Sequence, residues 1–477
     1  MSNASQCRVQ PSTRQCRNRH PSLRPFARRK KNTVSSPPRT PKSPRLTAAI
    51  QICLLWGGSL AGAGLAFLTQ VVLGRHMGPG DYGIFSNALA QCMLLSQVAG
   101  LGLQTFWLSA YGREGRHGAR WIPGCLKLLA ASSTLALLTL LLIAALGPGS
   151  HRTAETLALM APSILGFAAV ELVAAKLQLE ERFASVAAWQ AIHHGLRFAL
   201  ILPIVMTATG EILLETSAAY SLVAVIIVAI AIQQLRRMLR NDFEPLGHHG
   251  HRAREDTDEA PGMLRTLAHV WPYGADTLLY LAYFQCSNIL LLYLAGDRDA
   301  GIYFAAFTIM NATYLLPTTL YTKFLLSKLH RWAHHDQTKL LRALKTGSAS
   351  MLAAGTACGL AIWLASDFII NVLYGSRFQD AKPVLVTLAI CAPIRFVSTS
   401  IGAILTTGSQ MRMRVTIKAL CAALCVALNM LLIPEHGATG AAVATLGTEV
   451  GLLLLFSTAI YVRRTAIFRS AHNQYAH

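Results

Sequence analysis

The sequence predicts an all-α polytopic membrane protein in which twelve transmembrane helices form two six-helix lobes. Of its 477 residues, 53% are hydrophobic and only 14% are charged, whereas a soluble chain carries roughly 25% charged residues. The apolar residues gather in runs long enough to cross a bilayer, and one Gly-rich motif returns six runs later in the chain. These three observations predict the class, the number of crossings and the pairing of two halves.

The apolar runs give the expected crossings, because a transmembrane helix needs about 20 mainly apolar residues. Twelve runs reach that length: 47–73, 82–109, 122–146, 155–178, 184–207, 211–234, 266–293, 300–326, 346–370, 381–406, 413–433 and 438–462. Basic residues concentrate in alternate connections, at Arg113, Arg116, Arg120, Arg182, Arg236, Arg237, Arg240, Arg252, Arg254, Lys328, Arg331, Lys339, Arg412, Arg414, Arg463, Arg464 and Arg469. Since basic loops stay on the cytoplasmic side, both termini are predicted to be cytoplasmic.

A repeated motif relates the two halves. The stretch LGRHMGPGDYGIFSNA, residues 73–88, returns in altered form as LAGDRDAGIYFAAFTI, residues 294–309. Since each half has an even number of runs, both copies enter the membrane from the same side, which predicts a parallel repeat about an axis along the membrane normal. The glycines allow a tight reversal of the chain, and Gly83 and Gly301 are expected to permit close helix approach. Two further pairs, 147–157 with 374–385 and 209–220 with 436–445, argue against two unrelated Gly-rich turns.

The expected domains are a tail at 1–46, an N-terminal lobe at 47–240, a cytoplasmic linker at 241–264, a C-terminal lobe at 265–462 and a tail at 463–477. The first tail holds twelve Lys or Arg and no acid, so it is predicted to be disordered in the cytoplasm and to contact anionic membrane lipids. An organelle transit peptide is the alternative. No basic folded module follows that would indicate nucleic-acid binding. The ten cysteines contain no C-x-x-C pair, and His248–His251 alone do not predict a metal site.

Four stretches of the chain are similar to motifs of a known family. They are LGRHMGPGDYGIFSNALA, NVLYGSRFQDAKPVLVTLA, AILTTGSQMRMR and NMLLIPEHGATGAAVATLGTEV. Over about residues 47–465 the chain resembles the polysaccharide-transport branch of the multidrug/oligosaccharidyl-lipid/polysaccharide exporter superfamily, which contains the O-antigen and exopolysaccharide flippases. The resemblance implies two lobes in a V around a cavity that opens alternately to either side. It also implies a bacterial inner-membrane location and, as substrate, an oligosaccharide joined by pyrophosphate to undecaprenol.

The chain departs from that family at two places. Many relatives carry an acid in the seventh span where this chain has Asn288, so a coupling role based on that acid does not carry over. The first span also lacks the arginines of the lipid II flippase branch, which argues against a peptidoglycan precursor as substrate.

Two arginines lie near the middle of predicted spans, one in each half. A buried charge costs a few kcal/mol on insertion scales, so each is a candidate site. Arg197 follows His193 and His194 within one helical turn, and Arg395 holds a comparable depth in the other half. Together they are expected to bind a pyrophosphate from a shared cavity by bidentate hydrogen bonds. The alternative is that each arginine pairs within its own lobe with an acid such as Glu171 or Asp276.

Other polar residues at membrane depth add candidates. Three acids, Asp276, Glu171 and Glu449, are candidates for coupling to H⁺ or Na⁺ or for structural pairing. Three amides, Asn87, Gln91 and Asn311, are expected to donate to sugar hydroxyls or to bond between helices. Lys176, Lys323 and Lys418 are expected to extend to the inner interface.

These features favour a transporter over an enzyme. No nucleotide-binding P-loop is present, and no cofactor beyond a coupling ion is expected. The leading hypothesis is a flippase for lipid-linked oligosaccharide, with a polysaccharide polymerase and export machinery as candidate partners. A small-molecule exporter of the same fold is the first alternative. A membrane glycosyltransferase or polymerase is the second, although such enzymes generally carry acidic residues on large outer loops, which are short here.

Overall fold

The computed structural model of the protein describes residues 44–207, 211–240, 260–325, 337–404 and 411–469. Within these ranges the chain forms helices and no β-strand, which confirms the all-α class. The HHGH motif, His248–His251, lies outside the described residues. Ala48–His477 forms one compact unit, to which all the helix contacts and cavities belong.

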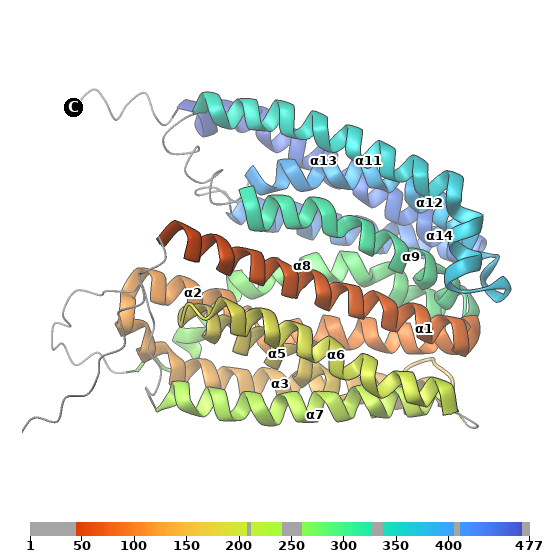
Figure 1. Ribbon diagram of the computed structural model, residues 1–477, viewed down its shortest axis with the longest axis horizontal. Helices are drawn as coiled ribbons and strands as arrows, with labels where there is room; N and C mark the ends of the chain where they lie inside the picture. Colours follow the sequence, from red (N-terminus) through yellow and green to blue (C-terminus); the bar gives the residue numbers. More distant parts are fainter. Residues whose placement is uncertain (1–43, 208–210, 241–259, 326–336, 405–410, 470–477) are drawn as a thin grey trace, which may run out of the picture. The chain divides into compact units, whose positions relative to one another are not determined.

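The first half of this unit contains seven α-helices and a 3₁₀ turn among its described residues (Figure 1). They are α1 (Pro44–Gly100), α2 (Leu103–Glu114), η1 (Gly115–Trp121), α3 (Ile122–Leu146), α4 (His151–Met160), α5 (Pro162–Leu179), α6 (Phe183–Thr207) and α7 (Ile212–Leu239). Helix α5 packs against α2, α6 and α7, and α4 packs against α3 and α7. The described residues therefore place α5 at the centre of the first half.

The described residues of the second half form a comparable set of helices. They are α8 (Met263–Leu294), α9 (Asp297–Thr318), the π-helical turn η2 (Thr319–Leu325), α11 (Gln337–Leu373), the 3₁₀ turn η3 (Ser376–Phe378), α12 (Ala381–Ala389), α13 (Cys391–Ile404) and α14 (Met411–Arg469). Helix α8 packs along α14 and also against α9, while α13 packs against α11, α14 and α9.

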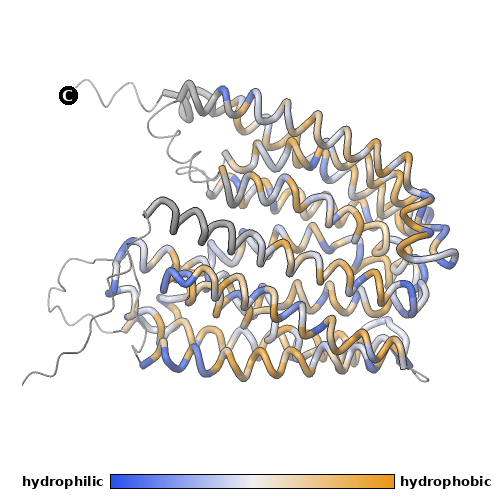
Figure 2. The backbone as a smooth tube through the Cα atoms, in the orientation of Figure 1, coloured by the Kyte–Doolittle hydropathy of each residue, from blue (hydrophilic) through white to orange (hydrophobic). Residues whose placement is uncertain are grey.

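Hydrophobic residues run along the lengths of the helices (Figure 2), and many of the large ones are exposed, as in a multi-pass membrane protein. Seven described helical stretches are long and apolar enough to cross a membrane, or eight if the bent pair α12–α13 is one crossing. Two of them, Gly57–Leu146 with 90 residues and Met413–Val462 with 50, far exceed the roughly 20 residues of one crossing. Both are broken inside, at Gly78 and Gly437 respectively. The count of twelve crossings and the two-fold relation of whole lobes stay predictions.

The repeated motif contains a matching backbone break in both copies. Gly78 has φ 77° and ψ 170°, and Gly296, at the corresponding place of the second copy, has φ 93° and ψ 177°. A residue with a side chain rarely adopts this region, so glycine is required at both turns. The expectation that these glycines reverse the chain is confirmed.

The two copies of the motif pack against each other through Gly83 and Gly301. A Cβ atom on Gly83 would overlap the carbonyl oxygen of Asp297, and a Cβ atom on Gly301 would overlap that of Pro79. Each blocked carbonyl lies four residues before the other glycine, so the contact is reciprocal, as in an interface between two-fold related surfaces. The expected close helix approach at both glycines is confirmed.

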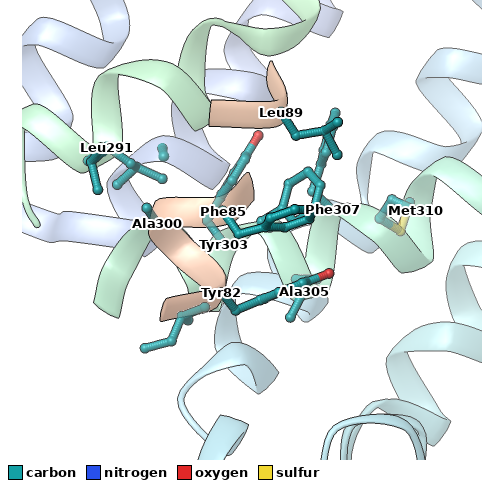
Figure 3. Packing of buried hydrophobic residues seen from close by; sticks show 14 of the residues in the cluster. Tyr82, Phe85, Leu89, Leu291, Ala300, Tyr303, Ala305, Phe307 and Met310 are labelled. Atoms are coloured by element: carbon teal, nitrogen blue, oxygen red, sulfur yellow. The ribbon is translucent and has the colours of Figure 1, made fainter. Parts of the chain in front are cut away.

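Large aromatic side chains surround this glycine contact. Figure 3 shows Tyr82 and Phe85 of α1 beside Tyr303 and Phe307 of α9, and all four are fully buried in one cluster. Tyr82 also packs its ring against Phe378, with ring centroids 6.0 Å apart. This aromatic seal, defined by these five residues, closes the space between the two halves at the end where the motif turns.

Helix α8 contacts both halves of the unit. Near its start, Gly274 packs backbone to backbone against Leu101 and Gly102 of the first half. Near its end, Asn87 Nδ2 donates to the Asn288 carbonyl at 3.1 Å, and Asn288 Nδ2 donates to the Ser86 carbonyl at 3.2 Å. The middle of α8 lies along α14 of the second half. Helix α8 therefore joins the two halves beside the space between them.

Candidate functional site

A cavity of about 430 Å³ lies between the two halves, next to the aromatic seal. Its wall draws on α1, α5, α6 and α7 of the first half and on α8, α9 and α13 of the second. Leu89 and Phe304 belong both to the buried cluster of the seal and to this wall. The volume falls within the roughly 300–1,000 Å³ range of small-molecule sites. We call it the central cavity.

Arg197 on α6 lines the central cavity without a counter-charge among the described residues. Only 5% of the residue is exposed, and its Nε and Nη2 atoms have no hydrogen-bond partner. The guanidinium carbon lies 4.6 Å from the Phe167 ring centroid and 4.4 Å from that of Tyr220. Such cation–π contacts hold the plane of the guanidinium but leave its N–H donors unused. Arg197 is therefore oriented by two rings, with Nε and Nη2 unpaired.

Arg395 on α13 lines the same cavity but is already paired. Its Nη1 atom donates to Glu449 Oε1 at 2.5 Å and to the Tyr283 hydroxyl, and Nη2 donates to the Tyr280 hydroxyl at 2.9 Å. The alternative of pairing within one lobe thus describes Arg395, although the partner is Glu449 rather than Asp276. Arg197 shows no such pair with Glu171 among the described residues.

Aromatic and hydrogen-bonding side chains complete the central cavity. Its aromatic wall comprises Phe67, Phe167, Tyr220, Tyr280, Phe284, Phe304 and Tyr314. Amide and hydroxyl groups come from Gln70, Gln285, Thr308 and Asn311. This combination suits a ligand with both an anionic group and flat or ring-shaped parts, because aromatic faces contact rings while a few polar groups fix orientation.

Two further cavities of about 390 Å³ each adjoin the central cavity through shared wall residues. The basic side cavity in the second half shares Tyr280, Thr318 and Arg395 with it and adds Arg414, Lys418 and Asp276. The polar side cavity is lined mainly by the first half. It shares Phe167 and His194 with the central cavity and adds Glu171 and His193.

The basic side cavity contains a buried ion pair that the sequence did not predict. Lys418 Nζ donates to Asp276 Oδ1 at 2.7 Å, and Arg414 Nε lies 3.7 Å from the same oxygen. The expectation that Lys418 extends to the inner interface is wrong, because only 5% of it is exposed. The same expectation fails for Lys176, whose Nζ lies 2.5 Å from Glu180 Oε1. The side chain of Lys323 is outside the described residues.

Removing the carboxylate of Asp276 should destabilise the fold. The Asp276→Ala variant leaves Lys418 buried without its partner, which costs about 3–5 kcal/mol for a buried pair. Thermal unfolding in detergent is expected to show a large loss for Asp276→Ala and a partial recovery in Asp276→Ala/Lys418→Met. The matched control is Asp367→Ala, since Asp367 pairs with Lys382 at 3.2 Å with both side chains about half exposed and such pairs contribute at most about 1 kcal/mol. Equal losses in the two single variants would contradict a structural role for the buried pair.

The three candidate acids have different surroundings. Glu449 and Asp276 are held by Arg395 and Lys418 respectively. Glu171 has no ion pair or hydrogen bond with the described residues, and it lines the polar side cavity. Their proposed coupling role stays a prediction, but two of the three carboxylates already neutralise neighbouring cations.

The three candidate amides also differ in their surroundings. Asn311 lines the central cavity. Asn87 and Gln91 line none of these three cavities: Asn87 donates to the carbonyls of Asn288 and Ile289 on α8, and Gln91 Nε2 donates to the Tyr293 hydroxyl at 2.8 Å. These two amides bond between helices rather than facing the cavity, because their side of α1 packs against the end of α8.

Sequence reasoning missed the aromatic groups around both arginines. Tyr280, Tyr283 and Phe284 surround Arg395 together with Tyr314. The first three stand at positions i, i+3 and i+4 of one helix, a spacing that places them on one face. That stripe was the signal available in the sequence. Phe167 and Tyr220, which flank Arg197, come from two different helices and offer no such pattern.

Comparisons with known proteins agree with this architecture. The sequence model of a family described as "Polysaccharide biosynthesis protein" matches residues 51–322. No curated protein matches the chain. The lipid II flippase MurJ in an inward closed conformation is similar with a TM-score of 0.66 and 12% identity, over 86% of this chain and 87% of that one.

Two transporter structures are also similar. An inward-facing multidrug resistance MATE family transporter of the MOP superfamily gives a TM-score of 0.62 and 15% identity, over 86% of this chain and 96% of that one. The MATE multidrug transporter DinF-BH, in a complex with a ligand, gives a TM-score of 0.62 and 14% identity, over 90% of this chain and 97% of that one. At these identities the similarity shows a shared fold.

Proposed function

Because the chain belongs to the polysaccharide biosynthesis protein family, we propose that it is a flippase for undecaprenyl-pyrophosphate-linked oligosaccharide repeat units. It moves them from the cytoplasmic to the outer leaflet of the bacterial inner membrane by alternating access, for the synthesis of exopolysaccharide or O-antigen. The protein acts as a transporter, without covalent chemistry. The multi-pass fold and the family support a lipid-linked sugar flippase or exporter.

One observation carries the proposal: the unpaired guanidinium of Arg197 in the wall of the central cavity. A pyrophosphate offers pairs of oxygen acceptors, to which the planar guanidinium can donate two parallel hydrogen bonds. Arg395, on the opposite half, lines the same wall, where Glu449 neutralises its charge. The aromatic wall then offers flat faces to sugar rings.

The aromatic seal assigns a state to this structure within the proposed cycle. The predicted orientation, with the basic connections in the cytoplasm, has the turns of the repeated motif on the outer side, so we propose that the closed end faces away from the cytoplasm. The cavity is then positioned to receive substrate from the inner leaflet. Separation of Gly83 from Gly301 would open the closed end, where the motif turns.

A small-molecule exporter is the second candidate, favoured by the aromatic wall of the central cavity. DinF-BH, which is similar in structure, is described as a multidrug transporter. An unpaired buried arginine repels cationic ligands, however, so the charge of this cavity favours an anionic substrate.

Deletion of the chain in its host tests the proposal. We expect lipid-linked repeat units to accumulate in the inner leaflet and surface polymer to disappear, with recovery on re-expression. Lectin binding to inverted and right-side-out membrane vesicles measures the leaflet. If the chain were a glycosyltransferase, its deletion would leave no complete repeat units. If it were a polymerase, its deletion would leave single repeat units on the outer leaflet. Unchanged surface polymer with no accumulation would favour the exporter.

A further inference from the structure

The polar side cavity differs in character from the two cavities that contain the arginines. Its wall carries hydroxyl and amide groups from Ser59, Ser96, Gln97 and Gln190, the two imidazoles of His193 and His194, and the carboxylate of Glu171. It contains no Lys or Arg among its described wall residues. It adjoins the central cavity, because Ala63, Met93, Phe167 and His194 line both.

Glu171 is the one exposed residue in a buried stretch of α5. From Ala168 to Leu177 every residue of α5 is buried except Glu171, which is exposed and lines this cavity. A charged residue in the apolar middle of a central helix is costly unless a polar space solvates it. With no cation bound to it among the described residues, the carboxylate offers its acceptor oxygens to the cavity.

His193 supplies a second set of unused hydrogen-bonding groups. Only 3% of the residue is exposed, and neither ring nitrogen has a partner. Its ring lies 4.6 Å from that of His194, the residue shared with the central cavity. Beside them, Ser59 Oγ donates to Gln190 Oε1 at 3.1 Å, which fixes the amide of Gln190 across α1 and α6. A buried polar group without a partner calls for an explanation, and a hydrogen bond to a ligand is one.

The charges of the two side cavities orient a substrate that is anionic at one end. On the wall of the basic side cavity Arg395 is neutralised by Glu449, but Arg414 and Lys418 still outnumber Asp276. On the wall of the polar side cavity Glu171 is the one carboxylate among the described residues. A pyrophosphate is therefore attracted toward the basic side and repelled from Glu171. Carboxylate, imidazole and amide groups together match vicinal hydroxyls, which both donate and accept hydrogen bonds.

We propose that the polar side cavity is the glycan subsite, which binds the hydroxyl groups of the neutral sugars nearest the pyrophosphate while Arg197 holds the pyrophosphate itself. This assignment rests on the proposed function. Glu171, His193 and Gln190 determine which sugars fit, and Glu171 disfavours acidic sugars through like-charge repulsion.

Binding to the purified full-length protein in detergent tests the subsite with two probes. One probe is undecaprenyl pyrophosphate, and the other is the same lipid carrying a single hexose, glucose or galactose. In the wild-type protein the hexose should raise affinity about five- to tenfold, as expected for one or two net hydrogen bonds. In Glu171→Ala and in Gln190→Ala that gain should disappear, while the sugar-free lipid binds within about twofold of wild type, which also shows that the variants are folded.

The control is Glu215→Ala, which removes an exposed carboxylate of α7 outside all three cavities and should keep the full hexose gain. Absence of any hexose gain in the wild type, or its persistence in both variants, would overturn the glycan subsite. Weaker binding of the sugar-free lipid in Glu171→Ala would instead assign the carboxylate to ion coupling or folding. Unchanged binding of the sugar-free lipid in Arg197→Ala would contradict the pyrophosphate site of the proposed function. The hexose gain, which compares the two lipids in one protein, tests the glycan subsite separately.

Discussion

The Arg197→Ala variant is expected to abolish surface polysaccharide while inserting into the membrane at wild-type levels. Loss of one partner of a buried, hydrogen-bonded charge pair costs about 2–5 kcal/mol in binding, which corresponds to a roughly 30-fold to few-thousand-fold loss. The measurements are surface polymer in cells and the affinity of undecaprenyl pyrophosphate for the purified protein.

The separation of function from stability is the decisive part of this prediction. In the protein without substrate, Nε and Nη2 of Arg197 bond to no described group, so alanine removes no hydrogen bond from those atoms. The loss is limited to the contacts with Phe167 and Tyr220, at about 0.5–2 kcal/mol each. It is offset in part because a buried unpaired charge disappears. Thermal unfolding in detergent should therefore change little.

Two further variants serve as controls for this experiment. Arg197→Lys keeps the charge without the planar donor fork, so it should retain partial activity. Arg237→Ala removes an exposed arginine near the end of α7, outside the three cavities, and should match the wild type. Wild-type polymer in Arg197→Ala would exclude Arg197 from transport. Loss of folded protein in Arg197→Ala would instead assign the Arg197 side chain a structural role.

The sequence predicted the class of fold and the depth of the charged residues, since both follow from composition along one helix. Apolar runs mark the helices, and Gly83 and Gly301 were recognised because both occupy the same place in the repeated motif. Arg197 and Arg395 were expected to face one cavity, and the structure places both on its wall. Their binding of substrate stays a prediction.

The partners of those residues could not be read from the sequence. Arg395 bonds to Glu449, which is 54 residues away on another helix, and Lys418 bonds to Asp276 across 142 residues. Depth in a span is a property of one helix, whereas a partner depends on how two helices are rotated about their axes. That rotation is set by packing between helices. The same limit applies to Asn87 and Gln91, whose side of α1 faces α8 rather than the cavity.

The Gly83→Ala variant is expected to hold the protein open at the end where the motif turns. In this structure an alanine Cβ atom at Gly83 would overlap the backbone carbonyl of Asp297, and neither backbone can yield as a side chain could. Overpacking of this kind costs about 1–3 kcal/mol. The cost applies only while the two copies of the motif touch, so it shifts the balance toward a state in which they are apart, by about 5- to 150-fold. Surface polymer should fall sharply, because a transporter that cannot close one end cannot complete its cycle.

Cysteine accessibility measures this shift directly. Ser86 directly follows Phe85 of the aromatic seal and is fully buried, so Ser86→Cys should resist a membrane-impermeant maleimide applied from the outer side. In Gly83→Ala/Ser86→Cys the labelling rate should rise several-fold or more above that of the native cysteines. Gly80→Ala is the matched control within the same motif, since a Cβ atom there meets no atom within 4 Å, and it should leave labelling and polymer unchanged. If Ser86→Cys stays protected in the Gly83→Ala background, the glycine contact does not govern opening, because a seal that tolerates the extra methyl group cannot depend on this backbone approach.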